Sequence, residues 1–507
     1  MGALADLWVI RWVLVSAVLA VFIASKIYTY RRLSAFRGPS SAGFTSFWHS
    51  RSFLTWNSHL FYQEVCDKYG PIARVGPNDL VTSSPELLAH MSAVRSKYSR
   101  GKWYNRATRF QPGKDHIFSM IDEEKHKLRR QQMAPGYSGK ENLALESSID
   151  VHVQELVDLI RTKYLSTETK SRPFDFARKT QYFTLDVISE VGFGEPFGDL
   201  RADRDINEYI ATGEIGLRVT TVGMALGLTW FLQLPLVARV LGPSESDVFG
   251  FGRMIANARS LIDLRLKRDM EKRSDMLASF FRHGLNAEEL LSETVLQIIA
   301  GSDTTAAAIR SIMLYIVSHP RVYAKLQEEV DARRRQGYAG IVPDSEARKL
   351  PYLQAVIKEG MRVHPPITDS MPKRVPDGGD TVMVDGQAVF LPGGTNISYA
   401  AWPLHHSKAI FGEDADDFRP ERWLLEKDDK RLAEMNRTHE LLFGYGKYQC
   451  LGKSIALMET SKVIFELFAH FDWSLSRPEA PWKESNCVGI FVQTDMWMVA
   501  SERHIQN

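Results

Sequence analysis

The chain has 507 residues, and its 44% hydrophobic and 24% charged content is that of a globular protein able to bury a sizeable core. A formal net charge of +2 argues against a nucleic-acid partner, which requires a strongly basic surface. The chain has three cysteines, a small and odd number that argues against a disulfide framework and indicates a reducing compartment.

The first candidate element is an apolar segment at residues 7–24, interrupted only by Arg11 and Ser16. Its length, about 18 residues, is close to the minimum that spans a bilayer. A cluster of positive charges follows, which predicts that the downstream side faces the cytosol: Lys26, Arg31, Arg32 and Arg37. A cleaved signal peptide is the alternative, but the apolar run is long and lacks a small-residue cleavage site. We therefore expect residues 1–37 to form a single-pass anchor in the endoplasmic reticulum membrane.

The body that follows a Gly-Pro-Ser-Ser hinge has no internal repeat, low-complexity tract or long linker, which predicts one large domain over residues 38–507. Helical periodicity predicts helices at residues 146–164, 290–319, 322–333, 352–364 and 454–468. Strand-like pieces are fewer and lie at residues 72–75, 80–82, 381–384, 388–391 and 497–500. The expected fold class is mainly α with a small β portion.

A second uncharged stretch, residues 219–238, raises the question of another membrane span. It contains Gly223, Gly227 and Pro235, which interrupt a regular helix. A buried or membrane-dipping helix pair explains this composition better than a span exposed to lipid.

The sharpest local signal is the loop Phe-Gly-Tyr-Gly-Lys-Tyr-Gln-Cys-Leu-Gly at residues 443–452, followed by a helical run. A thiolate ligand needs donors aimed at its sulfur, and the backbone N–H groups of a Gly-rich turn and a helix start supply them. The loop therefore indicates metal ligation by Cys450, and the alternative is a free buried cysteine in a turn. Cys66 and Cys487 lack such surroundings and are expected in the core.

This loop resembles the heme-binding signature of the cytochrome P-450 family. The resemblance implies heme b with Cys450 as the iron ligand and with Phe443, Gly444 and Gly452 around the cofactor. The sequence departs from the signature at Tyr448, where the family usually has an arginine that contacts a heme propionate. Lys447 is the neighbouring candidate for that contact, although a lysine is a weaker planar partner.

A second mark of the family is the pair of segments 359–362 (Glu-Gly-Met-Arg) and 420–423 (Pro-Glu-Arg-Trp). Alone, a Glu and an Arg three residues apart would be an ordinary helical ion pair. The resemblance implies a buried network of Glu359, Arg362 and Arg422 that supports the core behind the heme.

A third mark is residues 300–305 (Ala-Gly-Ser-Asp-Thr-Thr) in the middle of the long helix. Such polar side chains compete for backbone groups within a helix, so their presence suggests a function rather than a mere polar kink. By resemblance, Ala300 and Gly301 leave room beside the cofactor. Thr304 would hydrogen-bond dioxygen and Asp303 would relay protons.

A fourth mark is His126 with Arg130, one helical turn apart and thus on one face. The resemblance implies that both reach a heme propionate, against the alternative of a solvated basic helix. Another propionate contact is expected from Lys373 or Arg374, and the sequence does not decide between them.

The order and spacing of these marks imply that the resemblance covers the whole body, with some likeness to the pisatin demethylase branch of fungal microsomal enzymes. The implied activity is a monooxygenase that oxidises a lipophilic small molecule, such as a secondary metabolite. The expected apolar pocket residues are Val219, Val222, Met224, Leu226, Trp230, Phe231, Ile298, Ile367 and Phe491.

The sequence has no flavin-binding or nicotinamide-binding motif, so electrons are expected from a separate NADPH-dependent reductase. The protein itself is expected to be a monomer. Basic residues expected to meet its acidic surface are Lys125, Lys127, Arg129, Lys447 and Lys453. Two other functions stay open: a heme-thiolate isomerase or dehydratase that needs no reductase, and a non-enzymatic heme sensor. The first is disfavoured because such relatives usually lack the Asp–Thr pair.

Overall fold

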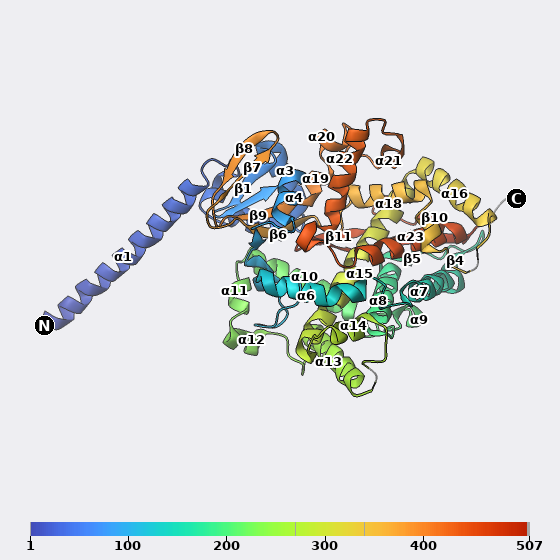
Figure 1. The fold of residues 1–507 in the computed structure, drawn as a ribbon, viewed down its shortest axis with the longest axis horizontal. Helices are drawn as coiled ribbons and strands as arrows, with labels where there is room; N and C mark the ends of the chain where they lie inside the picture. Colours follow the sequence, from blue (N-terminus) through green and yellow to red (C-terminus); the bar gives the residue numbers. More distant parts are fainter. Residues whose placement is uncertain (1, 269, 339, 504–507) are drawn as a thin grey trace.

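A long helix, α15 (Ala287–Ser318), runs through the centre of the body, as the computed structural model of residues 2–268, 270–338 and 340–503 shows (Figure 1). Asn286 caps its first turn, and the Glu289 carboxylate accepts from the Asn286 backbone N–H, so the helix begins three residues before the predicted start. The neighbours of α15 are α8 (Phe176–Phe193), α13 (Gly250–Arg268), α18 (Pro351–Val363) and α23 (Lys453–His470).

The other helices surround this centre. The longer ones are α2 (Phe47–Leu54), α3 (Ser58–Tyr69), α4 (Pro85–Ser92), α6 (Glu123–Tyr137), α7 (Leu145–Leu159), α10 (Tyr209–Ala225), α16 (Pro320–Arg335) and α22 (Asp429–Glu440). The shorter ones are α5 (Trp103–Ala107), α9 (Asp199–Ala202), α11 (Thr229–Leu232), α12 (Pro235–Leu241), α14 (Met276–Arg282), α17 (Asp344–Ala347), α19 (Ala401–His405), α20 (Lys408–Phe411) and α21 (Arg422–Leu425). The five predicted helices all exist. Their ends are shifted by up to three residues, except that α7 ends at Leu159 and a π-helical turn covers Ile160–Tyr164.

A five-stranded sheet lies at the end of the body nearest the N-terminal helix, in the order β1-β2-β9-β6-β3 (Figure 1). Its strands are β1 (Ile72–Gly76), β2 (Asp79–Thr82), β3 (Ser99–Arg100), β6 (Asp369–Arg374) and β9 (Asn396–Ala400). The remaining strands are β4 (Leu165–Ser166), β5 (Phe174–Asp175), β7 (Asp380–Val384), β8 (Gln387–Leu391), β10 (Phe471–Leu475), β11 (Lys483–Cys487), β12 (Ile490–Thr494) and β13 (Trp497–Glu502). The five predicted strands are present, and the mainly α fold class with a small β portion is confirmed.

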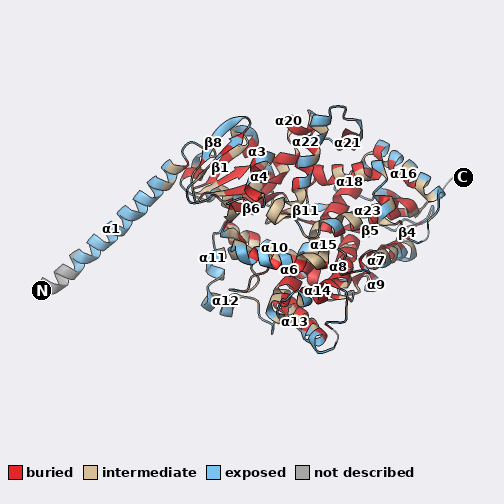
Figure 2. Ribbon diagram, viewed as in Figure 1, coloured by how far each residue is buried: buried red, intermediate tan, exposed pale blue. Residues whose placement is uncertain are grey.

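The N-terminal helix α1 (Gly2–Arg32) projects away from the body and is exposed along almost its whole described length (Figure 2). Residues 10–32 of it have a mean hydropathy of 2.0 and are long and apolar enough to cross a membrane. Its C-terminal end is fixed to the body, because Arg74 donates to the backbone carbonyls of Thr29 and Tyr30. The helix is therefore a candidate membrane span with a defined base.

Residues 219–238 do not form one span, because the chain breaks into the end of α10, then α11 and the start of α12. The part of the prediction that placed this stretch in the core is wrong for most of its apolar side chains. Trp230 is 52% exposed and Leu236 is 81% exposed. Gly227 adopts a φ of +68°, which lets the chain turn between α10 and α11. An exposed apolar surface of this kind needs a covering partner.

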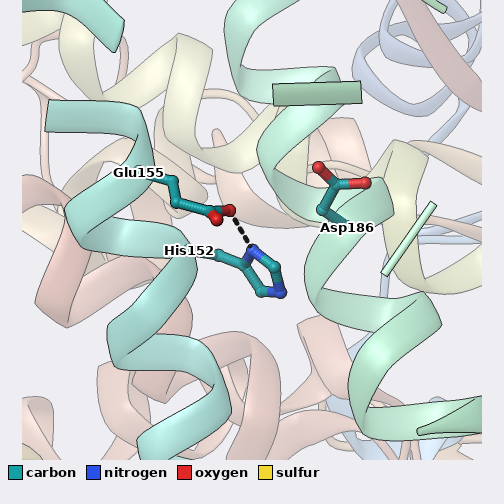
Figure 3. A group of neighbouring side chains, drawn as sticks. All are labelled: His152, Glu155 and Asp186. Atoms are coloured by element: carbon teal, nitrogen blue, oxygen red, sulfur yellow. Dashed lines mark hydrogen bonds and ion pairs between the residues drawn. The ribbon is translucent and has the colours of Figure 1, made fainter. Parts of the chain in front are cut away.

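Helices α7 and α8 are joined by a buried histidine between carboxylates, drawn in Figure 3 with its neighbours Glu155 and Asp186. His152 contacts Glu155 through Nδ1 at 2.8 Å and Glu190 through Nε2 at 2.6 Å. The Asp186 carboxylate accepts backbone N–H groups from residues 198–200 instead. Because these donor and acceptor atoms already have protein partners, the group acts as a polar tie between helices rather than as a metal site.

Candidate functional site

A large internal cavity lies between α15 and the loop that precedes α23, with a volume of about 820 Å³. Apolar side chains form most of its wall. Cys450 lines it from the loop, and Gly301 and Thr304 line it from α15. The cavity is therefore a space with one thiol at one wall and one hydroxyl-bearing helix at another.

The cysteine loop holds its shape through glycines that no other residue could replace without strain. Gly444 and Gly446 have φ values of +69° and +55°, and a side chain at Gly446 would lie 2.3 Å from the Ser92 carbonyl oxygen. The Cys450 N–H donates to the Phe443 carbonyl at 2.7 Å, which closes the loop. The side chain of Cys450 is thereby directed into the cavity rather than into the packed core.

The Cys450 thiol is accessible from the cavity although protein surrounds the loop. Burial raises the pKa of the thiol, whereas the backbone N–H groups of Gly452 and Lys453 and the nearby Arg130 lower it. These donors favour the thiolate, which is the form that ligates a metal. Cys66 and Cys487 are buried in the core as expected, and burial raises the pKa of Cys66 to about 12.

A cluster of cationic groups lines the same cavity near the loop. It comprises Arg100 on β3, Arg130 on α6 and Lys373 on β6, together with the His126 imidazole. Arg130 donates to the Gln449 carbonyl at 2.6 Å, so it is fixed beside the loop. Burial, together with the neighbouring cations, lowers the pKa of His126 to about 2. The cluster is an electropositive pocket inside the protein.

Arg100 belongs to this cluster, although the sequence analysis did not single it out. Its guanidinium group donates to the carbonyls of Ile117 and Met120, and its Nε atom is buried without a hydrogen-bond partner in the described part of the chain. Its guanidinium carbon also lies 5.0 Å from the centre of the Tyr448 ring. No local motif marks Arg100, because only the pairing of β3 with β6 brings it beside Lys373.

Lys447 and Arg374, two expected propionate contacts, are engaged elsewhere. Lys447 pairs with Glu123 at 2.9 Å and donates to the Tyr98 carbonyl. Arg374 bonds Asp377 at 2.6 Å and lies outside the cavity wall. Of the two alternatives on β6, Lys373 is the one that lines the cavity, because neighbouring residues of a strand point to opposite faces.

The cavity fits a flat apolar cofactor that carries negative groups at one edge. Buried cations without carboxylates beside them are costly unless an anion joins them. Burial lowers the pKa of both Arg100 and Lys373, and among the described residues Glu123 is the acidic neighbour that opposes this shift. Heme has two propionates at one edge and an iron that binds a thiolate. The chemistry of the lining residues therefore agrees with heme bound through Cys450.

The residues of the 300–305 segment of α15 face different sides of that helix. Thr304 lines the cavity and donates its hydroxyl to the Ala300 carbonyl at 2.9 Å. Gly301 also lines the cavity, but a side chain there would lie 2.6 Å from Ile188 of α8. Its small size is thus required by helix packing as well as by the cavity. Asp303 points toward α8 and is not among the lining residues.

The expected charged network behind the site lies fully buried between α18 and α21. Arg362 donates to Glu359 through Nε at 2.9 Å and Nη2 at 2.8 Å, and Arg422 donates to the same carboxylate at 2.7 Å. Trp423 adds a fourth donor at 2.9 Å. The arginines also bind the carbonyls of the segment that precedes α21, so the network fixes that segment to α18.

The pocket prediction is correct in part. Val219 and Ile367 line the cavity, whereas Ile298 is buried in the core and Phe491 packs against His364. The other residues expected in the pocket do not line it: Val222, Met224, Leu226, Trp230 and Phe231. Spacing along a helix cannot decide which side of the helix faces a cavity.

Fewer basic side chains than expected are free on the surface that was predicted to meet a reductase. Lys125 and Lys127 are exposed on α6, but Arg129 is buried and paired with Glu289 and Glu293. Lys447 and Lys453 have acidic partners as well: Glu123 and Glu440. The free part of this surface is therefore smaller than the sequence suggests.

Comparison with known proteins settles the class. Residues 39–496 match the profile of the cytochrome P-450 family, so the chain belongs to this family. It is 38% identical to cytochrome P-450 monooxygenase ABA1 of Pyricularia oryzae, over 96% of each chain. It is 37% identical to aba1 of Botryotinia fuckeliana, over 91% of this chain and 90% of the relative, and 34% identical to abl1 of Leptosphaeria maculans, over 92% and 82%. The chain is accordingly an oxidoreductase of the monooxygenase class.

Proposed function

We propose that this protein is a membrane-bound heme-thiolate monooxygenase that oxidises a lipophilic small molecule of fungal secondary metabolism, with electrons from a separate NADPH-dependent reductase. The observation that carries the proposal is that the Cys450 thiol and Thr304 of α15 line one apolar cavity. Cys450 would give a bound heme the thiolate ligand that monooxygenase chemistry requires, and Thr304 would supply a hydroxyl within the same cavity.

Bound heme supplies reductive activation of dioxygen, with one oxygen atom going to the substrate and the other to water. Cys450 would ligate the iron. The propionates would be held by Arg100, His126, Arg130 and Lys373, which line the cavity together. Phe443 and Gly444 border the thiol, and Ala300 and Gly301 border the opposite face. Glu359 and its two arginines hold the segments behind this site.

Thr304 is placed to donate or accept a proton at its hydroxyl, because that group lies on the cavity wall and, within the described part of the chain, bonds the Ala300 carbonyl alone. Asp303 is the nearest acid on the same helix. Burial raises its pKa to about 6, so it exchanges protons near neutral pH. We assign Thr304 the positioning of a proton at the cavity and Asp303 its supply.

The substrate is proposed to be lipophilic because the cavity wall is mainly apolar and because the exposed surface of α11 and α12 lies next to it. Leu232 and Leu241 belong both to these helices and to the cavity wall. An apolar molecule dissolved in a bilayer would reach the cavity along this route. The helix α1 would anchor the body at the endoplasmic reticulum with the catalytic domain in the cytosol.

The reductase is proposed to dock beside the cysteine loop, where Lys125 and Lys127 are exposed on α6. The test of the monooxygenase assignment is the variant Thr304→Ala in the purified holoenzyme with a reductase. NADPH consumption should continue while hydrogen peroxide replaces the oxidised product, because the proton at the cavity is lost.

The matched control is Ser311→Ala, which removes a hydroxyl that bonds the Ala307 carbonyl on the same helix without lining the cavity. Unchanged product per NADPH in Thr304→Ala would contradict the role of Thr304. The reduced carbon monoxide difference spectrum tests the ligand itself, since Cys450→Ala must lose the thiolate-type band. Turnover of a hydroperoxide without NADPH would instead favour an isomerase or dehydratase.

A further inference from the structure

The Asp303 carboxyl is held against α8, outside the lining of the cavity, by a side chain of that helix. Gln181 of α8 donates from its Nε2 atom to Asp303 Oδ1. On its other end, Gln181 accepts through Oε1 from Arg310, which lies two turns further along α15. Gln181 and Arg310 are each 4% exposed, so solvent does not replace these bonds.

The orientation of the Gln181 amide follows from the charges on both sides. An amide has a donor end and an acceptor end, so its NH₂ group faces the carboxylate and its oxygen faces the guanidinium. The reverse orientation would place two donors and two acceptors against each other. The arrangement therefore selects an ionised Asp303 and a protonated Arg310.

Other hydrogen bonds hold Arg310 in place, so Arg310 does not depend on Gln181 for its position. The Arg310 Nε atom donates to the Thr180 hydroxyl at 2.9 Å, and its Nη2 atom donates to the Ala177 carbonyl at 2.6 Å. Both acceptors are on α8, one turn or less from Gln181. Breaking the Gln181–Asp303 bond would leave these anchors intact.

We propose that Gln181 is a positioning residue that latches the ionised Asp303 against α8 and releases the carboxyl toward the cavity when Asp303 takes up a proton. The proposal rests on the proposed proton-supplying role of Asp303. A hydrogen bond to a carboxylate is about twice as strong as one to a neutral acid, so protonation weakens the latch. The released side chain is the protonated Asp303, which can give its proton to Thr304 or to water. The resulting carboxylate then takes its next proton from solvent.

The charges around Asp303 allow this cycle near neutral pH. The pKa of Asp303 is raised to about 6, mainly by burial and also by Glu214 of α10, while hydrogen bonds from Gln181 and Ser302 and the charge of Arg310 oppose this shift. Glu214 is paired with Arg178 of α8 at 2.5 Å, and Asp175 at the start of α8 acts on Arg310. The second oxygen of Asp303 lies 3.8 Å from where a side chain at Gly213 would begin, and Gly213 lines the cavity. Among the described residues other than the two next to Gly213 in the chain, no further side-chain atom lies within 4 Å of that point, so the glycine leaves room beside the carboxyl.

The test uses the holoenzyme and two readouts that do not depend on turnover. The first is the pKa of Asp303 from an infrared pH titration of its carboxyl band, assigned by its loss in Asp303→Asn. Gln181→Met removes the donor to the carboxylate and should raise this pKa by about one unit. Thr180→Val is the matched control, because it removes a partner of Arg310 from the same helix without touching Asp303.

The second readout is the crystal structure of the unaltered holoenzyme at pH 5 and at pH 8. Asp303 should bond Gln181 at pH 8 and leave it for the cavity side at pH 5. The proposal is overturned if Asp303 keeps this bond at both pH values, if Gln181→Met leaves the pKa unchanged, or if Thr180→Val shifts it equally. A failed peroxide test of Thr304→Ala would instead contradict the proposed function, because that variant leaves the Gln181 contact untouched.

Discussion

Arg100 places its guanidinium group over the ring of Tyr448, 5.0 Å from the ring centre, and both residues line the cavity beside Cys450. The heme loop of this chain has no arginine at position 448, where the family signature has one. The sheet supplies an arginine to that region from β3 instead, and the tyrosine ring supports it. A charge that the loop lacks is thus provided by a distant segment.

Replacing Arg100 with Gln should weaken heme retention without unfolding the protein. A hydrogen bond to a charged group contributes about 1.5–3 kcal/mol, which corresponds to roughly 10- to 100-fold faster loss of heme. The measurement is the rate of heme transfer to an excess of a high-affinity apoprotein. Arg374→Gln is the control, because Arg374 lies on the same strand system but bonds Asp377 outside the cavity. Equal rates for the two variants would exclude Arg100 from the heme site.

Replacing Glu359 with Gln should destabilise the body strongly. The carboxylate accepts from Arg362, Arg422 and Trp423 in a fully buried position, and breaking such a network costs about 3–5 kcal/mol. The midpoint of thermal unfolding should fall, with heme lost in the same transition. Glu346→Gln, which alters a solvent-accessible pair with Lys349, should leave the midpoint nearly unchanged. An unchanged midpoint in Glu359→Gln would show that the network is dispensable.

Stability should depend on pH through Asp199, a buried residue whose Oδ2 atom has no hydrogen-bond partner in the described residues. Burial raises its pKa from 3.8 to about 7, and Asp186 and Asp205 add to the effect. The folded protein therefore binds this proton more tightly than the unfolded chain, so stability is lost as pH rises from about 4 to about 7.

The variant Asp199→Asn removes this ionisation and should be more stable than the unaltered protein at pH 7.5, by about 1–4 kcal/mol, with little difference at pH 4.5. Urea unfolding at the two pH values measures the effect, with the exposed Glu168→Gln as a control. A gain of equal size at both pH values would mean that the charge of Asp199 is not its source.

Membrane attachment should have two separable parts. Deleting residues 2–26 removes the apolar helix but keeps Thr29 and Tyr30, whose carbonyls bond Arg74 of the body. The shortened protein should still bind liposomes weakly, because Leu236 and Val240 are 81% and 80% exposed on α12.

Adding Leu236→Glu and Val240→Glu to the deletion should release the protein into the supernatant after flotation with liposomes. Lys408→Glu, at an exposed position at the start of α20, gives a matched change of charge. Retention of the double variant on liposomes would place the second contact elsewhere.

Part of the site followed from short sequence patterns because its geometry is local. The loop around Cys450 is held by glycines and by a hydrogen bond between residues only seven positions apart in the chain, Cys450 and Phe443. The lone thiol could therefore be recognised before the fold was known. The same holds for Glu359 and Arg362, which share one helical face at a spacing of three residues. The helix α15 was recognisable because an apolar pattern of that length has few alternatives.

Other residues of the site could not be found in this way. Arg100 and Gln181 stand in no motif, and the sequence left Lys373 and Arg374 as alternatives. Each of these residues reaches its place through packing of segments far apart in the chain. The sequence also placed Arg129 on a solvated surface, whereas the fold buries it against Glu293 of α15. Whether a given face of a helix is buried depends on the segments that pack against it, and helical periodicity alone does not identify those segments.

By itself, the sequence determined the mainly helical class, the apolar N-terminal helix and the residues that stand close together along the chain, because local hydrogen bonding and hydrophobic periodicity act over a few residues. The tertiary structure alone decided which cations meet beside Cys450, which side of α15 faces the cavity and which side chain holds Asp303. These choices depend on long-range packing, where burial and charge are set by neighbours that the sequence order does not reveal.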